Sequence, residues 1–130
     1  MNWQEIYEQR KMTAKEAIKL IHSNDRVMIA HAVGVPLAIT DVLVEHKEDY
    51  QNVEIVQMVS MGNAKFCEPG TEGHFRLNSL FLGDHSKPAV KEGRGDFTQC
   101  HLDKDDAKNS VCRNMYPVLF LYNFIKHLTG

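Results

Sequence analysis

A chain of 130 residues is long enough for one hydrophobic core and too short for several domains. Hydrophobic residues make up 43% of it and charged residues 25%, which excludes a wholly disordered chain. The 15 basic and 17 acidic residues give a net charge of -2, and the basic residues are scattered along the sequence. Nucleic acid is therefore not an expected partner.

Targeting and redox features point to a reducing compartment. No apolar run reaches the roughly 18 residues that a membrane span needs. Residues 1–5 lack the basic-then-apolar order of a secretory signal peptide. The three cysteines (Cys67, Cys100 and Cys112) are an odd number without close pairing, which argues against a disulfide framework. We expect a cytoplasmic protein that does not associate with membranes.

The N-terminal residues predict a short amphipathic helix. Asn2 and Glu5 have the spacing of a capping box, which marks the start of a helix. Apolar side chains then fall on one face at helical spacing: Trp3, Ile6 and Tyr7. We expect this face to lie on the body of the domain.

A second capping box and an apolar run predict a helix followed by a strand. Thr13 and Glu16 have the capping-box spacing, and the apolar positions after them predict a helix over 13–22. Segment 26–31 then carries a continuous apolar run without polar alternation. That pattern is typical of a strand buried on both faces, as in parallel sheets.

The middle of the chain continues this alternation of helices and strands. Helical spacing returns at Leu37 and lasts until the charged stretch 45–49. Segment 53–60 is rich in β-branched residues and predicts a second strand, and segment 79–82 is the candidate for a third. Segment 65–76 between them is expected to be a long loop with at most one helical turn.

A last helix and the overall order of elements define the expected fold. Pro88 suits the first turn of a helix that runs to about Glu92 and is ended by Gly93. Strands that alternate with helices at this spacing predict an α/β fold. We expect an open, mainly parallel sheet flanked by helices.

The chain changes character near residue 102. Segment 103–108 is charged, whereas segment 115–125 has nine apolar residues in eleven positions and is too short to cross a bilayer. The apolar segment fits a core strand or a buried helix, and the alternative is an exposed segment without a partner. We divide the chain into a domain over 1–101 and a tail over 102–130.

Candidate binding residues follow from the topology. In an open α/β sheet, ligands bind beyond the carboxyl ends of the strands, which here are followed by loops 32–36, 61–66 and 83–87. The first loop could let its backbone approach a ligand, and the start of the next helix could hold a carboxylate or a phosphate. The candidate substrate-binding residues are His31, Gly34, Val35, Pro36, Gly62, Asn63 and His85.

Simpler structural roles compete with these assignments. The first loop could be an ordinary turn between a strand and a helix. His31 could be a core histidine that hydrogen-bonds backbone, and the same alternative holds for Asn63 and His85.

Other kinds of site are not expected. The spacing of Cys67 and His74 matches no zinc motif, and neither does Cys100–His101 with Cys112. The glycine patterns of dinucleotide-binding and phosphate-binding loops and the G-x-S-x-G serine motif are absent. We assign no metal site and no resident cofactor.

Many short segments of the first 98 residues share one resemblance. They are 3–7, 13–17, 25–27, 31–32, 34–36, 52–56, 72–76, 78, 80–81, 83 and 93–98. Each is weak alone, but in this order and spacing they resemble the amino terminus of the acetyl-CoA hydrolase/transferase family, and most closely its 4-hydroxybutyrate CoA-transferases. The resemblance implies a CoA-transferase-type N-terminal domain.

The resemblance also implies a reaction. In this family a glutamate carboxylate attacks an acyl-CoA thioester to give a mixed anhydride, and the released CoA thiolate then forms a glutamyl-CoA thioester. A second carboxylic acid finally takes over the CoA. The implied partners are an acyl-CoA and a short carboxylic acid, with coenzyme A as a substrate. Residues 34–36 would form part of the wall that faces the acyl group.

The resemblance does not extend to catalysis by this chain. Family members are longer, and their nucleophilic glutamate and glycine-rich CoA loop belong to the C-terminal half, so no catalytic residue is assigned here. Beyond residue 98 the sequence departs from the family, as a frameshift or an early stop would make it do. We expect an N-terminal fragment that is inactive alone and forms a homo-oligomer or pairs with a complementary C-terminal half. The alternative is a noncatalytic interaction module.

Overall fold

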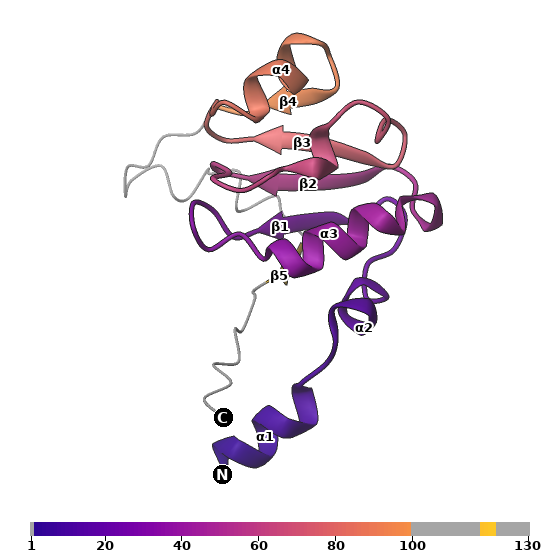
Figure 1. The fold of residues 1–130 in the computed structure, drawn as a ribbon, viewed down its shortest axis with the longest axis vertical. Helices are drawn as coiled ribbons and strands as arrows, with labels where there is room; N and C mark the ends of the chain where they lie inside the picture. Colours follow the sequence, from indigo (N-terminus) through magenta and orange to yellow (C-terminus); the bar gives the residue numbers. More distant parts are fainter. Residues whose placement is uncertain (1, 100–117, 122–130) are drawn as a thin grey trace.

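The fold is built on one parallel sheet (Figure 1). The computed structural model describes residues 2–99 and 118–121. The strands are β1 (Arg26–Ile29), β2 (Val53–Gln57), β3 (Phe75–Ser79), β4 (Gly95–Phe97) and β5 (Val118–Leu121). They lie in the order β4-β3-β2-β1-β5, and every neighbouring pair is parallel. The expected open, parallel α/β sheet is confirmed.

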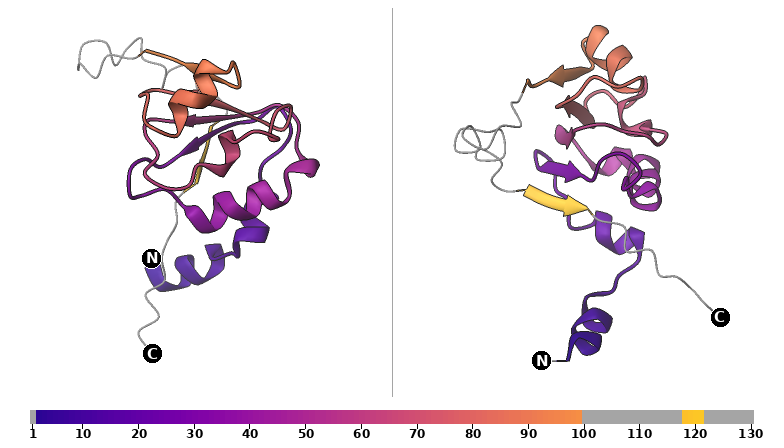
Figure 2. Two further views of the ribbon diagram at one scale, coloured as in Figure 1. Left: turned by 45° about the horizontal axis from the view of Figure 1, so that its top comes forward. Right: turned by 90° about the vertical axis from the view of Figure 1, so that its left-hand side faces the viewer.

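Helices lie over one face of this sheet. The α-helices are α1 (Trp3–Arg10), α2 (Ala14–Ile18), α3 (Leu37–Glu45) and α4 (Ser86–Lys91), with short 3-10 turns η1 (Lys47–Asp49) and η2 (Lys65–Cys67). Figure 2 shows α3, η2 and α4 on the same side of the strands. No helix among residues 2–99 is long and apolar enough to cross a membrane.

The hydrophobic core lies between the sheet and these helices. Val27 and Ile29 of β1 and Ile55 of β2 point into it and are almost completely buried. Arg26 and Met28, which alternate with them, are only partly buried. The expectation that β1 is buried on both faces is therefore wrong, because the described helices cover one face.

The opposite face of the sheet carries a row of polar contacts. The guanidinium group of Arg26 donates to the carboxylate of Glu54, its register partner on β2. Asn78 Nδ2 donates to Glu54 Oε1 at 2.8 Å, and Thr98 Oγ1 donates to Asn78 Oδ1 at 2.8 Å. These bonds link three strands and the residue after β4, so this face is held by polar contacts.

Helix α2 begins at the predicted capping box. Thr13 Oγ1 accepts from the Glu16 amide at 3.3 Å, and Glu16 Oε2 accepts from the Thr13 amide at 2.7 Å. The helix ends at Ile18, four residues earlier than predicted. The His22 amide, which would continue the helix by donating to Ile18, donates to Asp25 Oδ2 at 2.7 Å instead.

The third strand lies earlier than predicted. β3 spans Phe75–Ser79, so the assignment of a strand to 79–82 is wrong apart from its first residue. In β3 the buried Phe75 and Leu77 alternate with the more exposed Arg76 and Asn78, a pattern that is easily missed in a search for continuous apolar runs. The long loop before it holds the single helical turn η2, as predicted.

After β3 the described chain has the predicted helix α4, the strand β4, which was not predicted, and the strand β5, which lies in a segment predicted to be a core strand or a buried helix. Pro88 lies in the first turn of α4, and the chain turns after the helix at Gly93, which has a φ of 77°. β4 follows directly. β5 lies within the apolar segment 115–125 and pairs with β1. The other residues of that segment lie outside the described residues, and the domain boundary near 101 stays a prediction.

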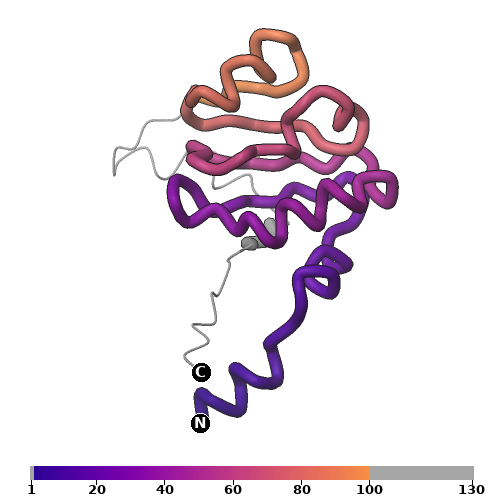
Figure 3. Tube along the Cα trace, viewed as in Figure 1, coloured from indigo at the N-terminus to yellow at the C-terminus, as the bar shows by residue number. Residues whose placement is uncertain are grey.

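Helix α1 forms as predicted but does not pack as predicted. Asn2 Oδ1 accepts from the Gln4 amide at 3.1 Å, and Asn2 Nδ2 donates to Glu5 Oε1 at 3.0 Å. None of the helix residues is buried, and 75% of Trp3 is exposed. Figure 3 shows the helix projecting from the body, so the expectation that its apolar face lies on the domain is wrong.

Candidate functional site

The loops that follow β1, β2 and β3 meet at the carboxyl edge of the sheet. Their strands are parallel neighbours, so the chain leaves all three at the same edge. The Ala32 amide donates to the Val59 carbonyl at 2.8 Å, which joins the first two loops. The Leu80 amide donates to the Gln57 carbonyl at 2.9 Å, where β2 and β3 end. The three loops chosen from the sequence are therefore adjacent.

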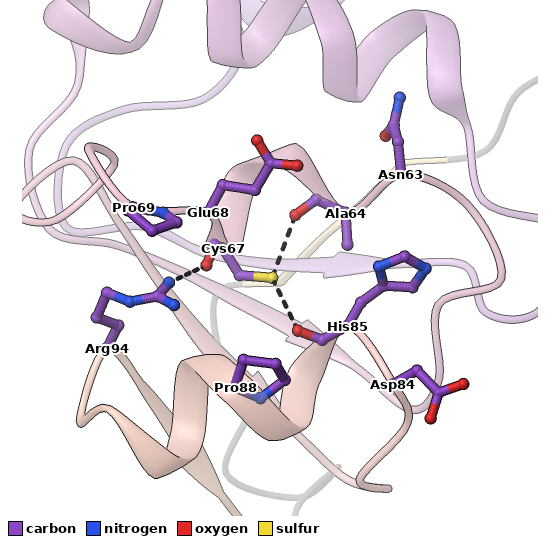
Figure 4. Close-up of a pocket in the computed structure, with 9 residues that line it drawn as sticks. All are labelled: Asn63, Ala64, Cys67, Glu68, Pro69, Asp84, His85, Pro88 and Arg94. Carbon is purple, nitrogen blue, oxygen red and sulfur yellow. Dashed lines mark hydrogen bonds between the residues drawn. The ribbon is translucent and has the colours of Figure 1, made fainter.

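A small pocket of about 190 Å³ opens beside this edge, between η2 and α4 (Figure 4). Two of the predicted residues, Asn63 and His85, line it from the loops after β2 and β3. The other lining residues are Ala64, Cys67, Glu68, Pro69, Asp84, Pro88 and Arg94. Parallel pairing thus brings Asn63 and His85 together although they are far apart in the sequence.

The position of Asn63 is fixed by an ion pair. Asn63 Nδ2 donates to Asp41 Oδ1 of α3 at 3.1 Å, and Lys65 Nζ lies 2.9 Å from the same oxygen. The hydrogen bond from Lys65 holds the pKa of Asp41 below its usual range. These contacts attach the loop after β2 to α3, and they direct the Asn63 amide toward α3 at the margin of the pocket (Figure 4).

Cys67 is a buried residue in the wall of the pocket. Its Sγ lies 3.1 Å from the Ala64 carbonyl and 3.6 Å from the His85 carbonyl, and its S–H can donate to either. Burial raises the pKa of this thiol, so it stays protonated at neutral pH. Cys67 therefore holds the two loops together and is not an activated nucleophile.

Arg94 closes another side of the pocket. Its guanidinium group donates to the Cys67 carbonyl and pairs with the Glu92 carboxylate at 2.6 Å. Because these partners occupy the group, Arg94 braces η2 against the end of α4. Sequence reasoning missed both Cys67 and Arg94, since their meeting depends on how η2 folds over the sheet.

The first loop lies beside the pocket and does not line it. His31 and Gly34 are exposed, whereas Val35 and Pro36 are buried, and Val35 packs in the core cluster. The sequence suggests that the backbone amides at the start of α3 could bind an anion, but two of these amides already donate to carbonyl groups of the chain. The Leu37 amide donates to the Val35 carbonyl at 2.9 Å, and the Ile39 amide donates to the Pro36 carbonyl at 2.9 Å.

Gly62 permits a close approach between the second loop and α3. A Cβ atom at this position would lie 2.6 Å from Cδ2 of Leu37, the first residue of α3. Glycine therefore lets this loop pack against the helix that follows the first loop. Gly62 shapes the carboxyl edge but does not line the pocket.

Three large apolar side chains are exposed at this edge, one in each loop. Val33 is 93% exposed, Met61 69% and Phe81 60%. We call these three residues the carboxyl rim. Sequence reasoning missed them. Val33 and Met61 lie in the predicted loops but were not selected, and Phe81 lies in the segment 79–82 that was predicted to be a strand. Exposed apolar groups can mark a surface that another layer of protein or a ligand covers.

Four glutamates among the described residues serve structural roles or lie at the surface. Glu54 accepts from Asn78, and Glu92 pairs with Arg94. Glu72 accepts from its own amide and from the Gly70 amide, and these bonds lower its pKa. Glu68 lines the pocket and is exposed. Residues 2–99 contain no group of three side chains placed to bind a metal ion.

The sequence matches proteins of known activity. Residues 1–110 match the acetyl-CoA hydrolase/transferase N-terminal domain. The chain is 43% identical over 100 residues to 4-hydroxybutyrate coenzyme A transferase from Clostridium kluyveri, covering 77% of this chain and 23% of that protein. It is 28% identical over 96 residues to butyryl-CoA:acetate CoA-transferase from Anaerostipes caccae, covering 72% of this chain and 21% of that enzyme.

Solved structures agree on the fold. RipA from Yersinia pestis superposes with a TM-score of 0.77 at 13% identity, over 94% of this chain and 30% of that one. A 4-hydroxybutyrate CoA-transferase from Porphyromonas gingivalis gives 0.60 at 19% identity, over 93% of this chain and 26% of that one. Among the sequence relatives, the chain spans less than a quarter of the length of each of the two enzymes named above. With its sequence and its fold in agreement, the chain belongs to the acetyl-CoA hydrolase/transferase family and corresponds to the N-terminal domain.

Proposed function

We propose that this chain forms the N-terminal part of an acyl-CoA:carboxylate CoA-transferase of the 4-hydroxybutyrate and acetate type. The observation that carries the proposal is the 43% identity to the Clostridium kluyveri enzyme, which extends across 77% of the chain. In this role the chain supplies one wall of the acyl site and the rest of a CoA-transferase supplies the nucleophilic glutamate. The chain alone is inactive.

The carboxyl edge supports this role. Acyl transfer through an anhydride requires a dry pocket, because water would hydrolyse the intermediate. The rim residues Val33, Met61 and Phe81 offer an apolar surface at the edge where α/β folds bind ligands. We infer that this surface faces the acyl chain and the rest of the enzyme. Asn63 and His85 both line the adjacent pocket. We infer that His85 and the second N–H of the Asn63 amide, whose first donates to Asp41, orient a short carboxylic acid.

The glutamates support inactivity of the chain alone. A nucleophilic carboxylate must be exposed to the thioester and free of competing partners. Glu54 and Glu92 are held by other side chains, and Glu72 is held by backbone amides. Glu68 is exposed and lines the pocket, and the resemblance places the family's nucleophile in the C-terminal half and not at this position. The reactive glutamate is therefore expected in the part of a CoA-transferase that this chain does not match.

The test is CoA transfer from acetyl-CoA to 4-hydroxybutyrate. The 130-residue chain is assayed alone and after co-expression with the part of the Clostridium kluyveri enzyme that lies beyond the matched region. We expect no turnover by the chain alone and formation of 4-hydroxybutyryl-CoA by the pair. Release of free CoA is measured in parallel, because it separates hydrolysis from transfer. Turnover by the chain alone would contradict its proposed inactivity, and an inactive but assembled pair would contradict the proposed role.

A second candidate function is a noncatalytic interaction module. It is favoured by β5, which pairs with β1 of the same chain and so extends the sheet without a partner. In that case the chain would dimerise or bind a full-length CoA-transferase without contributing to that enzyme's catalytic rate. Adding the chain to the intact Clostridium kluyveri enzyme distinguishes the two functions, since only the module forms a stable complex with an enzyme that already has its own N-terminal domain.

A further inference from the structure

The face of α1 that carries Trp3, Ile6 and Tyr7 has no partner among the described residues. Trp3 is 75% exposed and Tyr7 42%, and no residue of the helix is buried. Met12, in the segment after the helix, is a further exposed apolar residue. We call Trp3, Ile6 and Tyr7 the α1 face. Tryptophan and tyrosine are the residues that most often dominate binding at protein interfaces.

The helix has little that would keep it folded alone. It is eight residues long, and isolated helices shorter than about 12 residues are marginal in water. Its local support consists of the Asn2 cap and a surface contact between Lys11 and Glu8 at 3.4 Å. In Figures 1 and 2 it projects away from the sheet, beyond the side where β1 and β5 lie. A helix of this kind gains most of its stability from a surface on which its apolar face can pack.

The family match indicates what that surface is. The matched N-terminal domain spans residues 1–110, so α1 belongs to the part that this chain shares with much longer proteins. The chain covers only 23% of the Clostridium kluyveri relative, and the remaining length lies outside the described fold. An apolar face in the shared part is expected to meet something that those relatives share as well.

We propose that α1 is a docking arm whose apolar face packs on the C-terminal part of a CoA-transferase. The proposal rests on the proposed function, because it names the partner that completes the enzyme. The arm lies apart from the carboxyl rim, so it contributes to assembly and not to the chemistry. Loss of the α1 face should therefore weaken the complex while turnover at saturating partner stays the same.

The single tryptophan of the chain makes the docking directly observable. The chain is labelled with 5-fluorotryptophan and gives one ¹⁹F resonance, from Trp3. The unlabelled C-terminal part of the Clostridium kluyveri enzyme is then added. We expect the resonance to shift and broaden as Trp3 enters a protein interface. A shift that depends on the concentration of the chain alone would show that a second copy covers the face and would overturn the proposal.

Variants provide the quantitative test. Trp3→Ala should raise the Kd of the complex about tenfold or more, as expected for a central aromatic anchor. Gln9→Ala, at an exposed polar position of the same helix outside the α1 face, is the matched control and should change the Kd less than about twofold. Circular dichroism of each variant checks that the domain remains folded. Equal affinities for the two variants would overturn the proposal.

The outcomes separate this proposal from the proposed function. An active complex with an unchanged Trp3 resonance would refute the docking arm and leave the function standing. A shifted resonance in a complex without CoA transfer would support the arm and refute the function. Absence of any complex would refute both.

A full-length chimera, in which residues 1–98 replace the matched region of the Clostridium kluyveri enzyme, covers the case in which the separate part does not fold. There Trp3→Ala, and not Gln9→Ala, should lower the melting temperature.

Discussion

The carboxylate of Asp41 ties α3 to the loop after β2. It accepts from Asn63 and pairs with Lys65 through the same oxygen. We expect Asp41→Asn to lower the urea midpoint of unfolding slightly, because surface ion pairs contribute little, and to loosen the loop that carries Asn63. Urea titrations at pH 7 measure the first effect. Asp84→Asn, at a second carboxylate beside the pocket, is the control and should leave the midpoint unchanged.

The same ion pair predicts a pH dependence. The pKa of Asp41 is lowered in the folded state, chiefly by the hydrogen bond from Lys65, and returns to about 4 on unfolding. A group of this kind stabilises the fold above its unfolded pKa and loses that contribution as the pH falls through its folded pKa. Stability of the native chain should therefore decline below about pH 4 more steeply than that of Asp41→Asn. Parallel pH profiles of the two proteins would contradict this assignment.

A substitution at Gly34 tests whether the first loop forms part of the wall that faces the acyl group. A Cβ atom there would lie 3.2 Å from the His31 carbonyl oxygen, so any side chain requires the loop to shift slightly, and the branched side chain of valine also projects beyond the present loop surface. Gly34→Val in the reconstituted enzyme should raise the KM for 4-hydroxybutyrate several-fold, with little change in the KM for acetyl-CoA. Steady-state kinetics measure both. Unchanged constants would remove the loop from the site.

Individual site residues were predictable only where topology alone placed them. Asn63 and His85 meet because each follows a strand of the same parallel sheet, and strands can be recognised from the sequence. The contact of Cys67 with Arg94 arises from the path of η2 over the sheet, which no local pattern specifies. Val35 was a candidate for binding because of its position in the loop, and its burial in the core could not be inferred from that position.

At the level of elements, Thr13 is the clearest example of local control. Its side chain caps α2, and Ala17 and Ile18 of that helix are buried. Thr13→Ala should destabilise the protein by about 1 kcal/mol, the usual cost of losing such a cap. Thr13→Ser retains the hydroxyl group and should restore most of the difference. Urea unfolding of the three proteins measures the effect, and equal midpoints would show that packing alone holds α2.

The elements that were predicted correctly are those with local signals. The capping box at Thr13 and the apolar spacing from Leu37 both mark helices that form. β4 was missed because it has three residues and begins with glycine, so only its pairing with β3 defines it as a strand. β3 was displaced because the apolar run after it was taken for the strand. Both strands depend on partners distant in the sequence, which a local pattern does not contain.

At the level of the whole molecule, β5 tests where the domain ends. β5 pairs with β1 along the full length of that strand. A chain that ends at residue 101 lacks this partner, so β1 becomes an edge strand with open hydrogen-bonding groups. We expect faster amide exchange at residues 26–29 and more self-association than in a chain that ends at residue 121. Equal exchange in the two chains would support the boundary near 101 that the sequence predicts.

The pairing of β1 with β5 also bears on how the protein is made. β1 lies near the start of the chain, whereas β5 begins at Val118, so one side of β1 stays open while nearly all of the intervening polypeptide leaves the ribosome. A hydrophobic strand with one unpaired edge tends to associate with neighbouring nascent chains. The yield of this protein in cells should accordingly respond to translation speed and to the supply of chaperones that shield β1 until its last neighbour emerges.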